Sequence, residues 1–233
     1  MAEPRLGSPR VHLRLTGSTN AVARELAAAG APHGTLVSAT EQTAGRGRQG
    51  RAWVALPGRS LLCSWVIRDP SPLLSLAAGV AVAETIEAVL SEAAVKIKWP
   101  NDVLLEGRKL SGILVEGRPQ ERWAVLGIGL NVAIPQEDFP AELRERAGTL
   151  GLRSEDLDRV RDELQARLDH WVLAPDGEIL DAMRRRDALY GRPVSWDGGA
   201  GTAAGVDQDG RLLVDTDGGR VALDAGEVHL SRS

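Results

Sequence analysis

The densest group of residues that could do chemistry is the segment TAGRGRQGRAW at residues 43–53. Its glycines, Gly45, Gly47 and Gly50, match the pattern G-x-G-x-x-G. A dinucleotide fingerprint needs such glycines between a strand and a helix, because the helix N-terminus must face the pyrophosphate. The next stretch, RAWVALPGRS, has a proline and no apolar stripe at helical spacing, so the helix is missing. This disfavours a dinucleotide site, although Asp69 lies about where a ribose-binding acid would be wanted.

Two other classes fail on the same segment. No Gly-Lys-Ser/Thr follows it, which argues against a Walker loop. An RGG tract needs many repeats in a disordered segment with aromatic residues, whereas this is one short loop between apolar stretches. A flexible loop with three fixed cations, Arg46, Arg48 and Arg51, suits a compact polyanion, or a carboxylate held against a phosphate. Taken alone, the segment also fits a solvated surface loop.

Lysine is rare in this chain and is confined to one region. Lys96, Lys98 and Lys109 are the lysines among 28 basic residues. Lys109 begins KLSGILVEG, in which Gly112 allows close backbone approach by a ligand or a neighbouring element. A surface lysine is the alternative for Lys109, and chance clustering is the alternative for the three together.

Two further clusters carry amide side chains. KWPND, residues 98–102, places Asn101 where a strand ends, and a structural turn alone would explain Pro-Asn-Asp. GIGLNV, residues 127–132, alternates small and large residues and contains Asn131. That amide could contact a purine or ribose, or could only cap a turn.

The intervening sequence predicts a sheet with helices on a face. Ser18, Thr19 and Asn20 begin a helical pattern that stops at Gly30. A long, apolar helix is expected at residues 71–90. Branched or alternating stretches predict strands at residues 34–40, 59–68, 95–99, 103–105, 109–116 and 122–132.

The sequence pattern changes near residue 189, from helical stripes to short apolar stretches between turns. A helix is expected on the stripe that runs from Leu157 to Trp171, and another at residues 178–190. From Arg192 onward, short apolar stretches alternate with DGGAG, DQDG and DTDGG, which is typical of a small β-barrel or meander. We therefore expect an α+β protein with one domain at residues 1–188 and a second at 189–233.

Composition limits the class of protein. The 233 residues are 43% hydrophobic with a formal net charge of -4, so a sizeable core is expected and a general nucleic-acid binder is not. No segment resembles an export signal or is apolar and long enough to cross a bilayer. The single cysteine, Cys63, lies in the apolar run LLCSWVI and is expected in the core, which fits a cytoplasmic protein.

Five motifs together point further than each does alone. A Ser-Thr-Asn helix start, Gln42 before G-R-G-R-x-G-R, then K-W-P-N-D, K-L-x-G-I-L-x-E and G-I-G-x-N occur in this order. In this order and at these spacings they resemble the catalytic domain of biotin protein ligases. The resemblance covers roughly residues 12–233, including a C-terminal β-barrel cap.

The resemblance implies an ATP-dependent ligase. Such an enzyme joins the carboxylate of biotin to the α-phosphate of ATP, and then passes the biotinyl group to a lysine of a biotin carboxyl carrier domain of an acyl-CoA carboxylase. It further implies a mixed sheet packed with helices, similar to class II tRNA synthetases, with an SH3-like C-terminal domain. Mg²⁺ would accompany the phosphates, and no metal ligand is identified.

The matched motifs also imply site residues. Contacts with biotin or its adenylate are expected from Ser18, Thr19, Asn20, Gln42, Gly45, Arg46, Gly47, Arg48, Lys109 and Gly112. Contacts with the nucleotide are expected from Arg51, Trp53, Asn101 and Asn131. Gln49 is interpreted as a spacer.

Physical chemistry supports these roles. Arg48 and Lys109 are the expected catalytic pair, because joining a carboxylate to a triphosphate requires fixed cations. The neutral ureido ring of biotin instead needs paired donors and acceptors, which Ser, Thr, Asn and Gln supply. The loop glycines predict a segment that is loose when empty and closes Arg46 and Arg48 over the adenylate.

Alternatives remain at this stage. A lipoate-protein ligase shares the fold and the adenylate chemistry, but should need fewer polar groups than Ser18 to Asn20 and Gln42 supply. A noncatalytic adenylate-binding module is the other. Only seventeen residues precede Ser18, so the resemblance is to a short form without an N-terminal DNA-binding domain, and a homodimer is left open.

Overall fold

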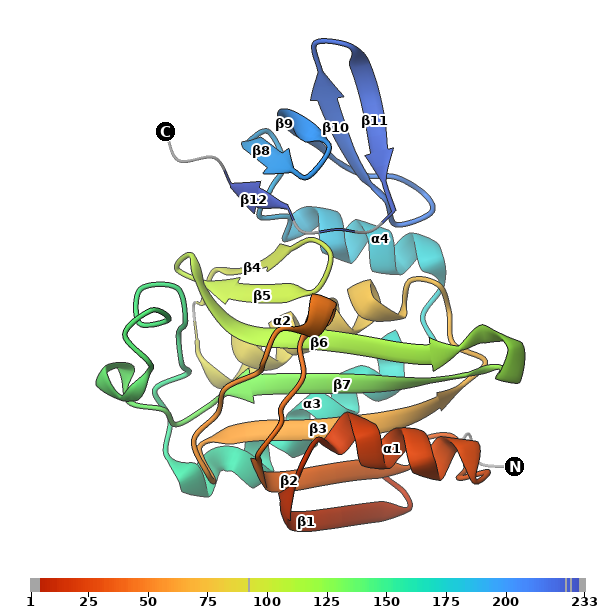
Figure 1. Ribbon diagram of the computed structural model, residues 1–233, viewed down its shortest axis with the longest axis vertical. Helices are drawn as coiled ribbons and strands as arrows, with labels where there is room; N and C mark the ends of the chain where they lie inside the picture. Colours follow the sequence, from red (N-terminus) through yellow and green to blue (C-terminus); the bar gives the residue numbers. More distant parts are fainter. Residues whose placement is uncertain (1–4, 92, 225, 227, 231–233) are drawn as a thin grey trace.

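A seven-stranded mixed sheet forms the body of the protein (Figure 1). The computed structural model describes residues 5–91, 93–224, 226 and 228–230. The strand order is β1-β2-β3-β7-β6-β5-β4, with β1 and β2 parallel and the other neighbours antiparallel. The strands are β1 (Arg10–Thr16), β2 (Leu36–Gln42), β3 (Ser60–Arg68), β4 (Val95–Lys98), β5 (Asp102–Leu105), β6 (Arg108–Arg118) and β7 (Trp123–Asn131). The expected α+β class with a mixed sheet is therefore confirmed.

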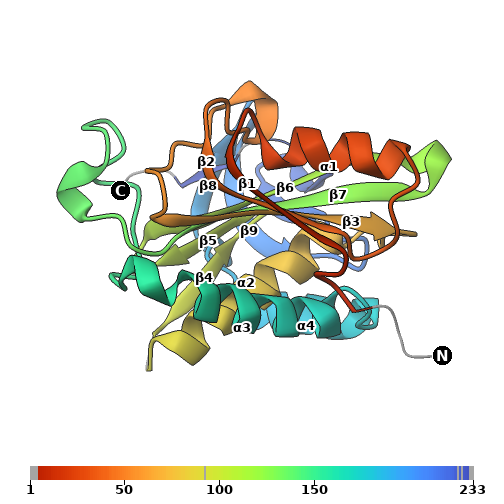
Figure 2. The ribbon, with the colours of Figure 1, turned by 90° about the horizontal axis from the view of Figure 1, so that it is seen from below.

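Helices cover both faces of this sheet (Figure 2). One face carries α1 (Thr19–Ala28), and the other carries α2 (Leu74–Val89), with α3 (Leu157–Trp171) and α4 (Asp176–Arg185) packed against α2. The helix α2 is apolar on nearly all of its faces, as expected for a helix that is enclosed by the sheet and by neighbouring helices. None of the helices that the structure describes is long and apolar enough to cross a membrane.

The prediction of a helix at residues 178–190 was wrong at its end. The helix α4 stops at Arg185, and the chain then runs beside β4. The amide of Ile97 donates to the carbonyl of Arg186 at 2.8 Å, and the amide of Ala188 donates to the carbonyl of Ile97 at 2.9 Å. These backbone bonds to β4 replace the bonds that would have continued the helix.

A second, antiparallel sheet follows α4. Its order is β11-β10-β9-β8-β12, formed by β8 (Pro193–Trp196), β9 (Gly199–Val206), β10 (Leu212–Thr216), β11 (Gly219–Leu223) and β12 (His229–Leu230). The expected small C-terminal β domain is thus confirmed, while a boundary at residue 189 stays a prediction. The two sheets share one core, since Val206 and Leu212 belong to the same buried cluster as α2. The indole of Trp99 also donates to the carbonyl of Gly210 at 2.9 Å.

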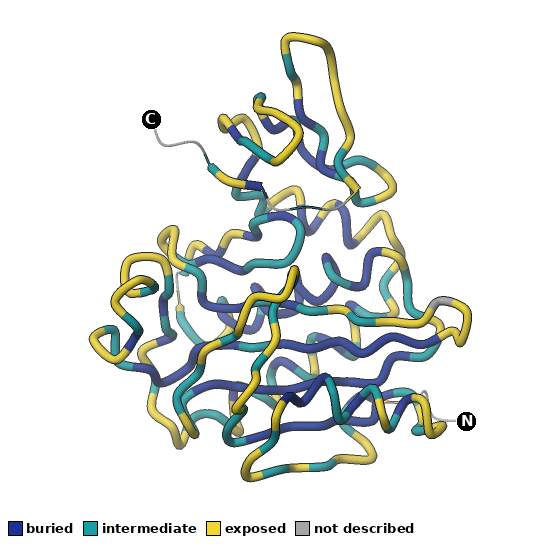
Figure 3. Tube along the Cα trace, in the orientation of Figure 1, coloured by how far each residue is buried: buried dark blue, intermediate teal, exposed yellow. Residues whose placement is uncertain are grey.

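Burial is deepest in β3 and β7 at the centre of the large sheet (Figure 3). Cys63 lies there and is 2% exposed, as the sequence predicted. The edge strand β1 was not predicted from the sequence. Its residues RVHLRLT alternate between polar and apolar types, which is a strand pattern, but none of them is buried.

Candidate functional site

The site is built on the face of the sheet that carries α1. In a strand every second side chain points to the same face. Ser64 on β3 lies opposite Gly127 on β7, which in turn lies opposite Leu114 on β6. Two residues farther along β7, and on the same face, Gly129 lies opposite Gly112 on β6. The floor of the site is therefore set largely by glycines of β6 and β7.

These glycines are needed because larger groups lie directly on them. A Cβ at Gly129 would lie 2.4 Å from Cε2 of Trp53, and one at Gly112 would lie 3.0 Å from Cζ3 of the same indole. A Cβ at Gly127 would overlap the side-chain amide of Asn20, so that position is also closed to a side chain. The spacing of GIG in the sequence thus matches the spacing of two side chains that pack over β7.

The loop at residues 43–53, here called the Gly/Arg loop, folds back on itself above this floor. The amide of Trp53 donates to the carbonyl of Gly45 at 2.9 Å, and the amide of Gly47 donates to the carbonyl of Arg51 at 2.7 Å. A single 3-10 turn, Arg48–Gly50, forms the tip, with Gln49 at a φ of 55°. No helix occurs between this turn and β3, where every residue is described, so the dinucleotide fingerprint is excluded.

One end of the site is neutral and polar. The amide of Thr19 and its hydroxyl both donate to Oε1 of Gln42, at 2.7 and 3.0 Å. A backbone N–H can only donate, so the carbonyl oxygen of Gln42 must face Thr19, and its NH₂ group takes no part in these bonds. Ser18, expected to cap α1, makes no capping bond with its side chain, and Gln42 satisfies the helix N-terminus instead.

Ser64 and Asn20 fix the floor beneath that end. The hydroxyl of Ser64 lies 2.8 Å from the Thr19 hydroxyl and 2.6 Å from Oδ1 of Asn20. The Asn20 amide nitrogen donates to the Leu114 carbonyl at 3.3 Å and to Oε2 of Glu116 at 2.9 Å. Asn20 is only 4% exposed and its hydrogen-bonding groups are engaged within the protein.

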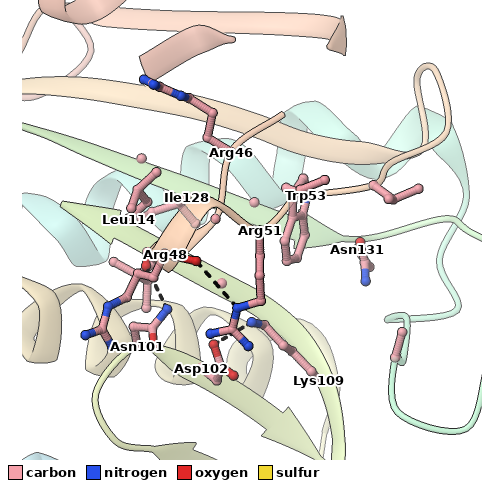
Figure 4. A pocket seen from close by; sticks show the side chains of 18 of the residues that line it. Arg46, Arg48, Arg51, Trp53, Asn101, Asp102, Lys109, Leu114, Ile128 and Asn131 are labelled. Carbon is pink, nitrogen blue, oxygen red and sulfur yellow. Dashed lines mark hydrogen bonds and ion pairs between the residues drawn. The ribbon is translucent and has the colours of Figure 1, made fainter. Parts of the chain in front are cut away.

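The other end of the site is cationic (Figure 4). Nζ of Lys109 lies 2.5 Å from Oδ1 of Asp102 and 5.8 Å from the centre of the Trp53 ring. Nη1 of Arg48 donates to Oδ1 of Asn101 at 3.2 Å, and the Asn101 amide nitrogen donates to the carbonyl of Ile113 at 3.0 Å. The turn after β4 and the first residue of β5 therefore supply a partner for each member of the expected catalytic pair.

Arg46 lines the cavity, and its guanidinium pairs with a carboxylate of β6. Its guanidinium points away from Arg48, Arg51 and Lys109 (Figure 4) and pairs with Oε1 of Glu116 at 3.3 Å. Closure of Arg46 over the adenylate beside Arg48 stays a prediction.

A cavity of about 630 Å³ joins the two ends. It is lined by almost all of the predicted residues, namely Ser18, Thr19, Asn20, Gln42, Arg46, Gly47, Arg48, Arg51, Trp53, Asn101, Lys109, Gly112 and Asn131. Gly45 does not line the cavity. A Cβ there would lie 2.4 Å from the carbonyl oxygen of Trp53, so Gly45 serves the closure of the loop.

Comparison with known proteins agrees with this geometry. Residues 13–132 match the Biotin/lipoate A/B protein ligase family, and residues 200–231 match the Biotin protein ligase C terminal domain. A biotin–[acetyl-CoA-carboxylase] ligase of Mycobacterium tuberculosis is 37% identical over 231 residues, which cover 91% of this chain and 85% of that one. The chain belongs to the biotin protein ligase family.

Other members of the family extend the comparison. The bifunctional ligase/repressor BirA of Bacillus spizizenii is 34% identical, with 97% of this chain and 75% of that protein covered. The structure of the biotin protein ligase from Aquifex aeolicus in complex with biotin and ATP matches with a TM-score of 0.78 at 28% identity. That match covers 97% of this chain and all of the other. The resemblance found in the sequence is confirmed, as are the ligase class and the fold.

Several residues that line or support the site of this biotin protein ligase had no role predicted from the sequence. Ser64 lies outside the five motifs, and Glu116, the last residue of K-L-x-G-I-L-x-E, was given no role. Extending the period-2 pattern from Gly127 and Gly112 along β3 and β6 would have indicated both. The segment after β7 was given no role, yet Phe139, Leu143, Glu145, Arg146 and Ala147 line the cavity, together with His229 and Leu230 of the second sheet. The amide of Lys109 donates to the carbonyl of Arg146 at 2.7 Å, which holds that segment beside β6.

Asn131 has a structural engagement that the sequence left open. It is 3% exposed, accepts from the Ser60 hydroxyl at 3.4 Å and donates to the carbonyl of Gly148 at 3.0 Å. Its contact with a nucleotide stays a prediction. As for metals, the described residues contain no group of three or more His, Cys, Asp or Glu side chains that could hold an ion.

Proposed function

We propose that this protein activates biotin with ATP as biotinyl-5'-AMP and transfers the biotinyl group to a lysine of a biotin carboxyl carrier domain. The observation that carries the proposal is the division of one cavity into a neutral end and a cationic end with Trp53 between them. Activation of biotin needs both ends, because the molecule has a neutral ring at one extremity and a carboxylate at the other.

The neutral end favours biotin over lipoate. Gln42 lines this end of the cavity, and its oxygen already accepts from Thr19, so its NH₂ group is the part of the side chain that a ligand could use. A ureido ring can accept from that group and can donate to neighbouring hydroxyls, whereas a dithiolane ring can do neither well. Leaving a site donor unpaired beside an apolar ring costs about 1–3 kcal/mol, which opposes lipoate.

The cationic end is suited to the first chemical step. A carboxylate oxygen of biotin forms a bond to the α-phosphorus of ATP, the bond to the bridging oxygen breaks, and pyrophosphate leaves. Negative charge accumulates on the α-phosphate oxygens, where fixed cations stabilise it without reorganisation. We assign this role to Lys109 and Arg48, which Asp102 and Asn101 already hold at one end of the cavity.

The second step uses the same enclosure. The amine of the acceptor lysine attacks the carbonyl carbon of the adenylate, and AMP leaves with the electron pair of the broken bond. Until the acceptor arrives, the mixed anhydride must be kept from water, and the Gly/Arg loop above the floor provides that cover. Arg51, Trp53, Asn101 and Asn131 are the residues that we propose lie by the nucleotide.

Substrate and partner follow from these roles. Mg²⁺ would enter with ATP, because this ion is usually bound through substrate phosphates and water rather than by a cage of protein ligands. We propose the carrier domain of an acyl-CoA carboxylase as the protein partner, supported by the acetyl-CoA-carboxylase ligases among the relatives. Residues 189–233 are proposed to form an SH3-like C-terminal domain, and the cytoplasm is the proposed location.

One experiment tests the function. The protein is incubated with biotin, ATP, Mg²⁺ and a carrier domain, and the carrier is weighed by mass spectrometry. One added biotinyl group is expected, and none when the acceptor lysine of the carrier is replaced. Lipoate in place of biotin should give little product. No modification of a competent carrier, or preferential use of lipoate, would overturn the proposal.

A further inference from the structure

Glu116 lies outside the cavity, yet it contacts two of the elements that enclose it. It stands on β6 two positions beyond Leu114, on the face that carries α1. Here β6 pairs with β7 alone, because β5 pairs with β6 only as far as Gly112. We propose that Glu116 is a positioning residue, which sets both the floor of the biotin end and the rest position of the Gly/Arg loop. The inference rests on the proposed function.

The first role acts through Asn20. Oδ1 of Asn20 faces the Ser64 hydroxyl at 2.6 Å, so its NH₂ group must find acceptors on the opposite side. Oε2 of Glu116 at 2.9 Å and the Leu114 carbonyl at 3.3 Å are those acceptors. Because Asn20 is buried, loss of the carboxylate would leave a donor unsatisfied next to Ser64 and Thr19. Thr19 lines the end of the cavity that is proposed to take the ureido ring, and Ser64 lies beneath it.

The second role acts through Arg46. Oε1 of Glu116, the oxygen not used by Asn20, lies 3.3 Å from Arg46 and 3.5 Å from Arg24 of α1. Farther along the loop, Arg48 contacts Asn101 beyond β4. The loop is thus tied at Arg46 to β6 and at Arg48 to the turn after β4, and the guanidinium of Arg46 points away from the other cations (Figure 4).

One carboxylate therefore links the loop to the floor. When the loop is displaced, Arg46 leaves Oε1, but Oε2 can still hold Asn20. The two roles are separable by chemistry, because glutamine at position 116 keeps one oxygen for Asn20 and loses the negative charge that attracts Arg46 and Arg24. Alanine loses both.

The experiment has two readouts. The first is trypsin cleavage after Arg46, Arg48 and Arg51 in the ligand-free protein, followed by mass spectrometry. Both Glu116→Gln and Glu116→Ala should be cut there about two to five times faster than wild type, as expected for loss of a half-exposed ion pair. This readout needs no catalytic activity, so it remains valid if the proposed function fails.

The second readout is steady-state biotinylation of the carrier. Glu116→Ala should raise the KM for biotin about tenfold with kcat within about twofold of wild type. Glu116→Gln should stay within about threefold of wild type in KM, since the Asn20 bond is kept. Failure of the wild-type protein to modify the carrier would refute the proposed function and leave the trypsin result to decide on Glu116.

Glu121→Gln is the matched control, because Glu121 pairs with Arg118 at 2.8 Å on the same hairpin and contacts neither Arg46 nor Asn20. It should match wild type in both readouts. The proposal is overturned if Glu116→Gln is cut no faster than Glu121→Gln, or if Glu116→Ala lowers kcat while the KM for biotin is unchanged. If Glu116→Ala does not fold, the trypsin comparison of the two glutamine variants still decides.

Discussion

The indole of Trp53 lies across Gly129, so closely that a Cβ on Gly129 would approach Cε2 of the ring to 2.4 Å. Lys109 lies over the same ring, 5.8 Å from its centre. The absence of a side chain at this position of β7 thereby determines where an aromatic side chain of the Gly/Arg loop lies, and with it the surface that faces Lys109.

Gly129→Ala should displace Trp53 without unfolding the protein. Overpacking of this kind costs about 1–3 kcal/mol, and here the indole rather than the backbone can yield. We expect the KM for ATP to rise about tenfold or more. Gly177→Ala is the control, since a Cβ there meets nothing within 4 Å and alanine favours a helix. A Gly129→Ala variant with wild-type KM values would show that the position of Trp53 does not matter for the nucleotide.

Lys109→Ala should slow formation of the adenylate about 100-fold to 1000-fold, the usual cost of removing a group that stabilises transition-state charge. Lys109→Arg should restore little, because a planar guanidinium cannot replace a compact ammonium beside Asp102 and Trp53. Pyrophosphate release in the absence of carrier is the measurement. Lys96→Ala, at an exposed position on β4, should behave as wild type. Normal release by Lys109→Ala would remove that residue from the catalytic role.

Arg48→Ala should increase the share of adenylate that escapes to solution. Its guanidinium ties the tip of the loop to Asn101, and loss of the tie opens the cover over the intermediate. The measurement is rapid filtration of protein loaded with labelled biotin and ATP, and a several-fold larger free fraction is expected. Arg185→Ala, at the exposed end of α4, serves as the control. Equal retention by both variants would contradict the assignment.

Trp99→Phe tests whether the second sheet helps to position the turn at Asn101. The variant leaves the Gly210 carbonyl without its 2.9 Å hydrogen bond and loosens the turn that carries Asn101 and Asp102. A loss of about 1 kcal/mol in the free energy of unfolding is expected, together with a several-fold higher KM for ATP. Urea titration and kinetics measure the two effects. If only stability changed, and changed no more than in Trp196→Phe, the second sheet would have no part in positioning the turn.

Cys63 predicts a pH dependence of stability. Burial raises the pKa of its thiol to about 12, whereas an unfolded thiol ionises near ~8.5. The stability contributed by the neutral thiol is therefore fully present below pH ~8.5 and is lost as the pH rises toward 12. Between pH 7 and pH 10 the free energy of unfolding should fall by about 2 kcal/mol more in wild type than in Cys63→Ala. Parallel pH profiles would mean that the thiol is accessible to solvent.

How far the sequence could predict the fold depended on the burial of each element. The buried strands β3 and β7 and the helix α2 carry long apolar runs, and their predicted positions were confirmed. The edge strand β1 has no such run, and its residues only alternate between polar and apolar types. The end of α4 was misplaced because backbone bonds to Ile97 stop that helix, and nothing within the helical pattern itself indicates a partner so distant in sequence.

The candidate site shows the same limit. Motifs brought out the residues of the Gly/Arg loop, the turn at Asn101 and the strand start at Lys109, which the structure gathers in one cavity. Ser64, Glu116 and the partnership of Lys109 with Asp102 depend on strand register and on side-chain direction. The direction taken by Arg46 likewise depends on a carboxylate seventy positions away, which a linear motif does not record.

The glycine floor limits how this protein could change its ligand. Every substitution at Gly112, Gly127 or Gly129 adds at least a Cβ, and each would press on Trp53 or Asn20. The floor can therefore lose space but cannot gain new contacts, so it offers no graded route to altered preference. Directed evolution toward a biotin analogue should accordingly find its successful changes in the Gly/Arg loop, in the first turn of α1 and in the segment after β7, while the strands beneath stay as they are.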